Sequence, residues 1–227
     1  MQTFLTIVDI IGIIGFGASG ALVAIDRETD FFGVLFLSVI TAFGGGAIRD
    51  VLLCRPPVFF TTLIDVAVCV AVGLIAYFLA FFFKDAYIRN EATVAQICNV
   101  FDAVGLGVFA VFGVQISIEA GSTDPFKAIF LGMTTCIGGS IMRDLMLDTV
   151  PGVLRKHIYA LAAILAASVY YILYMAGAGT VAATIFGFFS GFLLRMAATV
   201  FKWDLPPAIR FGAKEKEENK KESCEKK

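Results

Sequence analysis

The sequence predicts an all-α membrane protein with seven transmembrane helices, arranged as two inverted three-helix repeats plus a seventh helix. The composition gives the membrane, since 59% of the 227 residues are hydrophobic, only 16% are charged, and the mean hydropathy is +0.86. Soluble domains are far less apolar than this. The length of the apolar segments predicts transmembrane helices, and an internal repeat predicts how these helices are arranged.

Seven apolar segments are long enough to cross a bilayer, which takes about 20 helical residues. Hydrocarbon offers the backbone no hydrogen-bond partner, so uniformly apolar segments of this length fit helices rather than the alternating strands of a barrel. The predicted spans lie at about 4–25, 32–53, 58–83, 94–118, 126–147, 158–176 and 180–201.

The basic residues favour a cytoplasmic C-terminus. With seven spans, one side of the membrane carries the tail and five loop residues: Arg27, Lys84, Arg89, Arg155 and Lys156. The loops of the other side have only Arg55 and Lys127. Loops rich in lysine and arginine stay in the cytoplasm, so the N-terminus is expected outside.

The chain repeats itself. "VDIIGIIGFGASG", beginning at Val8, aligns with "FDAVGLGVFAVFG", beginning at Phe101, at an offset of 93 residues. "TDFFGVLFLSVITAFGGGAIRDVLL" then aligns with "TDPFKAIFLGMTTCIGGSIMRDLML" at an offset of 94. Three spans are an odd number, so the second copy enters the membrane from the opposite side, as in transporters built around a site between inverted repeats. A purely structural duplication is the alternative.

The repeat sets the domain boundaries. The first three-helix repeat covers residues 1–93, the inverted second repeat 94–179, the seventh helix 180–207, and a disordered charged tail 208–227. The aligned "TDFF" and "TDPF" predict helix starts. Asp30 and Asp124, or the threonines before them, can cap the free N–H groups, and Pro125 suits a first helical position.

Glycine motifs end the second and fifth spans. They consist of Gly44, Gly45 and Gly46 in the first copy and Gly138, Gly139 and Ser140 in the second. Glycine costs about 1 kcal/mol relative to alanine in a helix interior, and adjacent glycines permit kinks. The motifs therefore predict helix breaks whose carbonyls face a permeating ion. Close helix packing by small residues is the alternative.

Arg49 and Arg143 follow these motifs within the apolar spans. A charge there costs at least about 2.5 kcal/mol, so each should face the bundle interior, a partner or water. Adjacent helical residues point about 100° apart. We therefore expect each arginine to pair with a carboxylate or freed carbonyls of the other half rather than with Asp50 or Asp144. For these two aspartates, snorkelling to the interface is the alternative.

Further charges within the apolar spans include two acids and one base. Asp9 and Asp102 are candidate partners of the two arginines or charges of a vestibule; the alternative is that they are helix N-terminal acids favoured by the dipole. Arg195, in the seventh span, is another charge that must be satisfied.

Catalytic, metal-binding and nucleic-acid-binding signatures are absent from the sequence. The five cysteines show no C-x-x-C pair or metal-ligand spacing, and the only histidine, His157, lies in a loop. No serine or cysteine is paired with a usable base, and no nucleotide loop or basic patch is present. We therefore expect no enzyme activity, no metal, no cofactor and no nucleic-acid partner.

"GGGAIRD" and "GGSIMRD", together with Arg195 and "WDLP" at 203–206, resemble the prokaryotic branch of the trimeric intracellular cation (TRIC) channel family over about residues 4–207. The resemblance implies a homotrimer among membrane lipids, in the prokaryotic inner membrane. Each protomer would hold its own pore for monovalent cations, chiefly K⁺.

The matching motif residues carry the implied roles. The glycines would form kinks, less sharp at Ser140, and the motif charges Arg49, Asp50, Arg143 and Asp144 would lie beside them. Bacterial relatives of this group are also associated with uptake of small amino acids such as glycine. The sequence therefore predicts a K⁺ channel, with a transporter of a small zwitterion as the alternative.

Overall fold

The computed structural model describes residues 2–60, 62–155 and 158–203, and these residues form helices without any strand. This confirms the all-α prediction. The elements are α1 (Gln2–Asp26), α2 (Phe31–Leu52), the 3₁₀ helix η1 (Val58–Phe60), α3 (Leu63–Phe82), α4 (Lys84–Arg89), α5 (Glu91–Glu119), α6 (Pro125–Met146), α7 (Gly152–Arg155), α8 (Tyr159–Met175) and α9 (Thr180–Val200).

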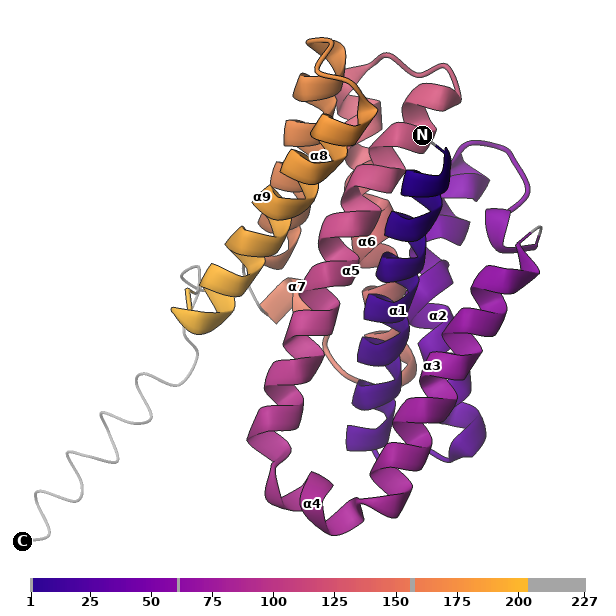
Figure 1. Cartoon of the computed structure of the whole chain (residues 1–227), viewed down its shortest axis with the longest axis vertical. Helices are drawn as coiled ribbons and strands as arrows, with labels where there is room; N and C mark the ends of the chain where they lie inside the picture. The colour runs from indigo at the N-terminus through magenta and orange to yellow at the C-terminus, as the bar shows by residue number, and fades with distance from the viewer. Residues whose placement is uncertain (1, 61, 156–157, 204–227) are drawn as a thin grey trace, which may run out of the picture.

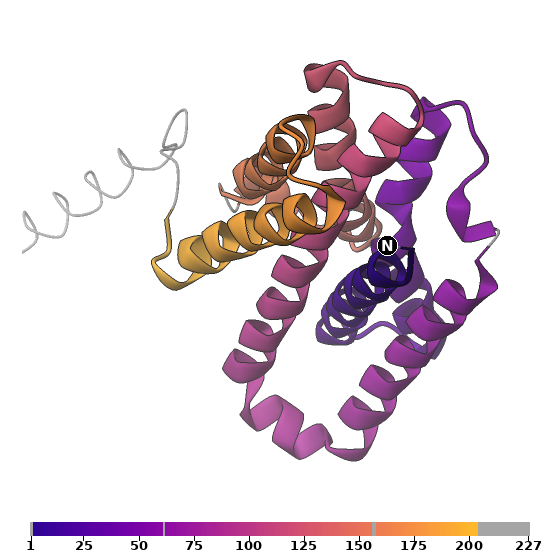
Figure 2. The same ribbon diagram turned by 45° about the horizontal axis from the view of Figure 1, so that its top comes forward.

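Four helices form the centre of the bundle. α1 packs against α2 and α5, and α6 packs against the same two helices. The contact is apolar at its middle, where Ile13, Phe16, Leu106 and Val108 are buried. α3 covers α1 and α2 on one side, whereas α8 and α9 lie against α5 on the other (Figures 1 and 2).

Corresponding helices of the two sequence copies run in opposite directions. In Figure 1, α1 descends while α5 ascends, and α2 ascends while α6 descends. Their neighbours correspond too, since α3 contacts α1 and α2 as α8 contacts α5 and α6. The two copies therefore occupy equivalent places around the centre.

The predicted helix starts of α2 and α6 are confirmed. The Asp30 carboxylate accepts a hydrogen bond from the Gly33 N–H at 2.7 Å, and the Asp124 carboxylate accepts one from the Lys127 N–H at 2.8 Å. Pro125 is the first residue of α6, where its missing N–H costs nothing. The same capping geometry in both copies starts both motif helices at the same register.

Six of the described helices are long and apolar enough to cross a membrane: α1, α2, α3, α5, α6 and α9. α8 is apolar but has only 17 residues. The third span begins at Leu63 rather than at 58, because Pro56 and Pro57 interrupt the chain and η1 follows them.

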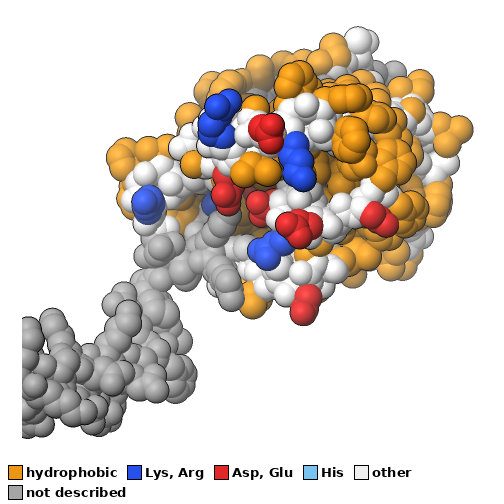
Figure 3. Space-filling model, turned by 90° about the horizontal axis from the view of Figure 1, so that it is seen from below, with side chains coloured by type: hydrophobic (Ala, Val, Ile, Leu, Met, Phe, Trp, Pro, Cys, Tyr) orange, Lys and Arg blue, Asp and Glu red, His pale blue; other side chains and the backbone are white. Residues whose placement is uncertain are grey.

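Apolar side chains cover much of the outside of the bundle, as expected where lipid replaces water. The largest exposed examples include Phe82 of α3 and Phe126 of α6. Charged side chains instead gather at the end of the molecule that carries α4 (Figure 3). The expectations for Lys156, His157, the "DLP" residues 204–206 and the tail fall outside the described residues.

Candidate functional site

The glycine motifs bring α2 and α6 into backbone contact. A Cβ on Gly45 would overlap the carbonyl oxygen of Thr135, and a Cβ on Gly139 would overlap that of Thr41. Both helices run continuously through their motifs. Neither motif breaks its helix in this structure, and the alternative of close packing holds, because the absent side chains allow two intact helices to cross at backbone distance. A kink at these residues stays a prediction.

Arg143 pairs with the next residue of its own helix. Its Nε donates to Asp144 Oδ1 at 2.8 Å, and its Nη1 donates to Ser19 Oγ of α1 at 3.2 Å. The second oxygen of Asp144 accepts the N–H of Gly152 at 2.7 Å. Asp144 thus neutralises the arginine and holds the chain leading into α7.

Arg49 repeats this arrangement in the first copy. Its Nε donates to Asp50 Oδ1 at 2.9 Å, and the N–H of Val58 donates to Asp50 Oδ2 at 2.9 Å. Arg55 also donates to Asp50, through Nη2 at 2.7 Å. Val58 and Gly152 correspond at the repeat offset of 94, so the same aspartate holds the same loop twice.

The predicted pairing of arginines with carboxylates across the repeat is wrong. Helix geometry separates adjacent Cβ directions, but the long arginine side chain folds back so that its Nε meets the neighbouring carboxylate. Snorkelling is also wrong, since Asp50 is 1% exposed and Asp144 is 7% exposed. Excluded from water, each aspartate is held by charge-assisted hydrogen bonds from several donors.

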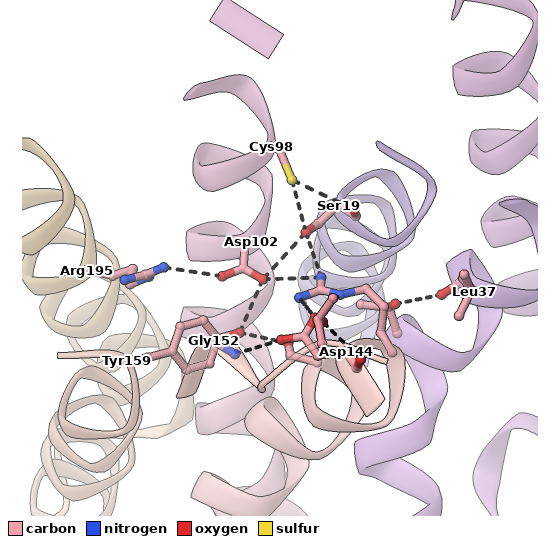
Figure 4. Close-up of polar contacts among 12 residues, drawn as sticks. Ser19, Leu37, Cys98, Asp102, Asp144, Gly152, Tyr159 and Arg195 are labelled. Carbon is pink, nitrogen blue, oxygen red and sulfur yellow. Dashed lines mark hydrogen bonds and ion pairs between the residues drawn. The ribbon is translucent and has the colours of Figure 1, made fainter. Parts of the chain in front are cut away.

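Asp102 is a partner of Arg143, as predicted. Asp102 Oδ1 lies 3.9 Å from Arg143 Nη1, and Asp102 Oδ2 lies 3.9 Å from Arg195 Nη2. The Tyr159 hydroxyl donates to Asp102 Oδ1 at 3.2 Å and meets Ser140 Oγ at 2.8 Å. Figure 4 shows Asp102 between Arg195 and Ser19, with Tyr159 below it. It lies deep within α5, so the alternative of a helix N-terminal acid does not apply to it.

Two polar cavities lie at opposite ends of α1 and α5. The Arg143 cavity, of about 390 Å³, lies between residues 19–27, at the C-terminal end of α1, and Glu91–Asp102 of α5. The Arg49 cavity, of about 880 Å³, lies between Leu5–Ile13 of α1 and Phe109–Glu119 of α5. α1 and α5 are antiparallel, so the two cavities lie toward opposite ends of the bundle.

A short apolar layer separates the cavities. Residues 14–18 of α1 and 103–108 of α5 line neither cavity. Phe16, fully buried in this layer, packs against Phe109 with ring centroids 5.3 Å apart. The contact of Gly45 with Thr135 closes the neighbouring helix pair at the same place. The two cavities therefore approach each other without merging.

Carboxylates outnumber guanidinium groups in both cavities. The lining of the Arg49 cavity includes four acids and one base: Asp9, Asp50, Asp65, Glu119 and Arg49. The lining of the Arg143 cavity includes four acids and three bases: Asp26, Glu91, Asp102, Asp144, Arg27, Arg143 and Arg195. Cavities of net negative charge raise the local concentration of cations. In the described part of the chain, His, Cys, Asp and Glu do not form a metal-binding cluster.

The polar cavity residues that sequence reasoning missed include Ser19, Asp65, Gln115 and Tyr159. Asp65 and Tyr159 could have been found, because they correspond at the repeat offset of 94 and each lines the cavity of its own copy. Ser19 and Gln115 carry no such signal, since the corresponding residues Phe112 and Leu22 are apolar.

The fold and the cavities define a multi-pass helical membrane protein with a charged interior between two homologous halves. A family model described as "Glycine transporter" matches residues 6–81 and 99–175, and the two matched segments are displaced by the 93 to 94 residues of the repeat. The chain belongs to this family.

Curated relatives agree with this assignment. The chain is 38% identical over 168 residues to a UPF0126 membrane protein of Deinococcus radiodurans, covering 73% of this chain and 74% of the relative. It is 34% identical over 201 residues to the UPF0126 inner membrane protein YadS of Escherichia coli K12, covering 87% and 93%.

Solved structures share the fold over nearly their whole length. The structure of a prokaryotic TRIC channel in 0.5 M KCl superimposes with a TM-score of 0.81 at 30% identity, covering 90% of this chain and 100% of that one. The TRIC orthologue of Rhodobacter sphaeroides gives a TM-score of 0.79 at 34% identity, covering 89% and 100%.

Proposed function

We propose that this protein is a homotrimeric cation channel in which each protomer conducts monovalent cations, chiefly K⁺, between the Arg49 cavity and the Arg143 cavity. The observation that carries the proposal is the pair of net-negative cavities that approach each other from opposite ends. The likeness of the chain's fold to TRIC cation channels of known structure supports it.

The proposal includes the arrangement of the chain in the membrane. α8 joins the six longer helices as a spanning segment, which makes seven spans in two inverted repeats, 1–93 and 94–179, with α9 (Thr180–Val200) as the seventh helix. The opposite directions of α1 and α5 support the inversion. The C-terminus lies in the cytoplasm of a bacterium, with lipid around the trimer.

The motif residues act together in the proposed gating. In the described conformation the glycines hold α2 against α6, and Phe16 closes the layer beside them. Opening requires these helices to separate or to bend at Gly44–Gly46 and Gly138–Ser140. Arg49 and Arg143, neutralised by Asp50 and Asp144, then border the path without repelling the ion.

Planar bilayers test this function. Purified protein should give unitary K⁺ currents that are unaffected by glycine. A protein that carries glycine without unitary currents would contradict the proposal. Opening of this layer is the conducting step, so a variant that widens it should raise the open probability.

A second candidate function is transport of a small zwitterion such as glycine through the Arg143 cavity. One observation favours it: the buried Arg195 Nε has no hydrogen-bond partner among the described residues, and Arg195 flanks Asp102 in that cavity. A guanidinium group could bind the substrate carboxylate while Asp102 binds its ammonium group. Saturable counterflow of labelled glycine in proteoliposomes, lost in Arg195→Gln, distinguishes this function from conduction.

A further inference from the structure

The two cavities differ in whether their acids are already occupied. In the Arg143 cavity, Asp102 faces Arg143, Arg195 and the Tyr159 hydroxyl. In the Arg49 cavity, its counterpart Asp9 makes no hydrogen bond or ion pair with the described residues, and it interacts at longer range with Asp65 and Arg49. The duplication thus left one cavity with an uncommitted carboxylate.

Asp65 adds a second carboxylate to the Arg49 cavity that makes no hydrogen bond or ion pair among the residues the structure describes. It lines this cavity and repels Asp9 electrostatically. Its counterpart in the second copy is Tyr159, whose hydroxyl donates to Asp102 and thereby stabilises that charge. Two like charges in one cavity are unfavourable until a cation lies between them.

A second observation, separate from the two carboxylates, points to a ligand in this cavity: the amide oxygen of Gln115. This side chain is 7% exposed and lines the Arg49 cavity. Its Nε2 donates to Glu119 Oε1 at 2.9 Å, which orients the amide, and its buried Oε1 then has no partner within the described part of the chain. An unsatisfied buried carbonyl oxygen costs about 1–3 kcal/mol, so a ligand that satisfies it is favoured.

We propose that Asp9, Asp65 and the amide oxygen of Gln115 form a binding site for a partly hydrated monovalent cation in the Arg49 cavity. Oxygen ligands suit a hard cation. The residues do not form a tight metal-binding cluster in the described chain, so water completes the coordination. The site rests on the proposed cation conduction, for which it is the loading position on one side of the apolar layer.

Direct binding tests the site independently of current. Thermal unfolding of the purified protein is measured in KCl and in choline chloride of equal ionic strength, because choline is too large for a site of this kind. We expect K⁺ to raise the unfolding temperature of the wild type in a saturable manner. Asp9→Asn, Asp65→Asn and Gln115→Leu should each weaken the apparent K⁺ affinity by about threefold or more.

Gln115→Leu is the sharpest variant, because it nearly keeps the side-chain volume and introduces the residue that the first copy carries at the corresponding position, Leu22. Asp85→Asn is the matched control, since it removes an exposed carboxylate of α4 that lines neither polar cavity. Its K⁺ dependence should equal that of the wild type.

Single-channel recording separates the site from the proposed function. If the site loads the channel, Asp9→Asn and Asp65→Asn should lower K⁺ current more at low than at high KCl. Saturable K⁺ binding without any K⁺ current would contradict the channel and leave the site standing. K⁺ currents with binding and conductance unchanged in all three variants would overturn the site and leave the channel standing.

Discussion

Gly45 of α2 and Thr135 of α6 touch so closely that a methyl group on the glycine would overlap the threonine carbonyl oxygen. Gly139 and Thr41 repeat this contact with the helices exchanged. The bundle is therefore joined at its centre by two backbone contacts, which lie between the two polar cavities. If the channel is closed at this point, the glycines allow the close contact that closes it as well as the bending that would open it.

The first prediction concerns these glycines. Gly45→Ala and Gly139→Ala should each destabilise the protein by about 1–3 kcal/mol, because overpacking forces the helices apart, and should raise the open probability of the channel. Gly46→Ala is the control within the same motif, since its Cβ would meet only Arg49, at 3.5 Å. Thermal unfolding in detergent and bilayer recording check both effects. Equal behaviour of Gly45→Ala and Gly46→Ala would show that the contact is unimportant.

The second prediction concerns the apolar layer. Phe16→Ala should cost about 3–5 kcal/mol of stability, as for other buried aromatic truncations, and should let K⁺ leak between the cavities. Potassium efflux from proteoliposomes measures the leak. Phe186→Ala, at a side chain that is 62% exposed on α9, should change neither quantity appreciably. An unchanged efflux with Phe16→Ala in a folded protein would place the barrier elsewhere.

The third prediction concerns the buried ion pair of the second copy. Asp144→Asn removes the carboxylate that Arg143 and the Gly152 N–H share. Breaking a buried pair costs about 3–5 kcal/mol, so we expect a marked drop in unfolding temperature. Asp148→Asn changes an exposed carboxylate of the same loop at φ 52°, which asparagine tolerates, and should leave the temperature unchanged. Similar drops in both variants would show that the loop charge, rather than the pair, matters.

The fourth prediction concerns ion selectivity. Arg49 is the base in the lining of a cavity that holds four acids, and Asp50 keeps Arg55 as a partner when Arg49 is replaced. Arg49→Gln should therefore make the mouth more negative and raise the permeability of K⁺ relative to Cl⁻. The reversal potential in a KCl gradient measures this ratio. A shift toward the Cl⁻ equilibrium potential, or no shift, would exclude the arginine from the path.

Much of the fold was predictable because it rests on local and periodic features. The apolar segments, the helix starts at Asp30 and Asp124 and the repeat all follow from neighbouring residues or a fixed offset. The membrane forces the apolar segments into helices whatever their partners. The predicted partnership of Asp102 with Arg143 also holds, since a charge so deep in an apolar span must be met by another.

The wrong predictions share one cause: each concerned a feature that depends on side-chain contacts in the folded protein. Consecutive glycines allow either a break or a close crossing, and the sequence does not distinguish these outcomes. Arg49 pairs with its neighbour Asp50 although the Cβ atoms of adjacent helical residues point about 100° apart. The long, flexible arginine side chain bends back far enough to reach the carboxylate.

The sequence alone determined that this chain is a duplicated helical membrane protein with charges at matched places in its two halves. Those features depend only on the order of residues along the chain, because the bilayer favours long apolar helices and a fixed placement of basic loops whatever the helices pack against. Only the tertiary structure decided that Asp102 is held while Asp9 stays uncommitted. Their local sequences are alike, and the difference arises from residues such as Tyr159 and Arg195. These residues meet Asp102 only when distant helices pack together.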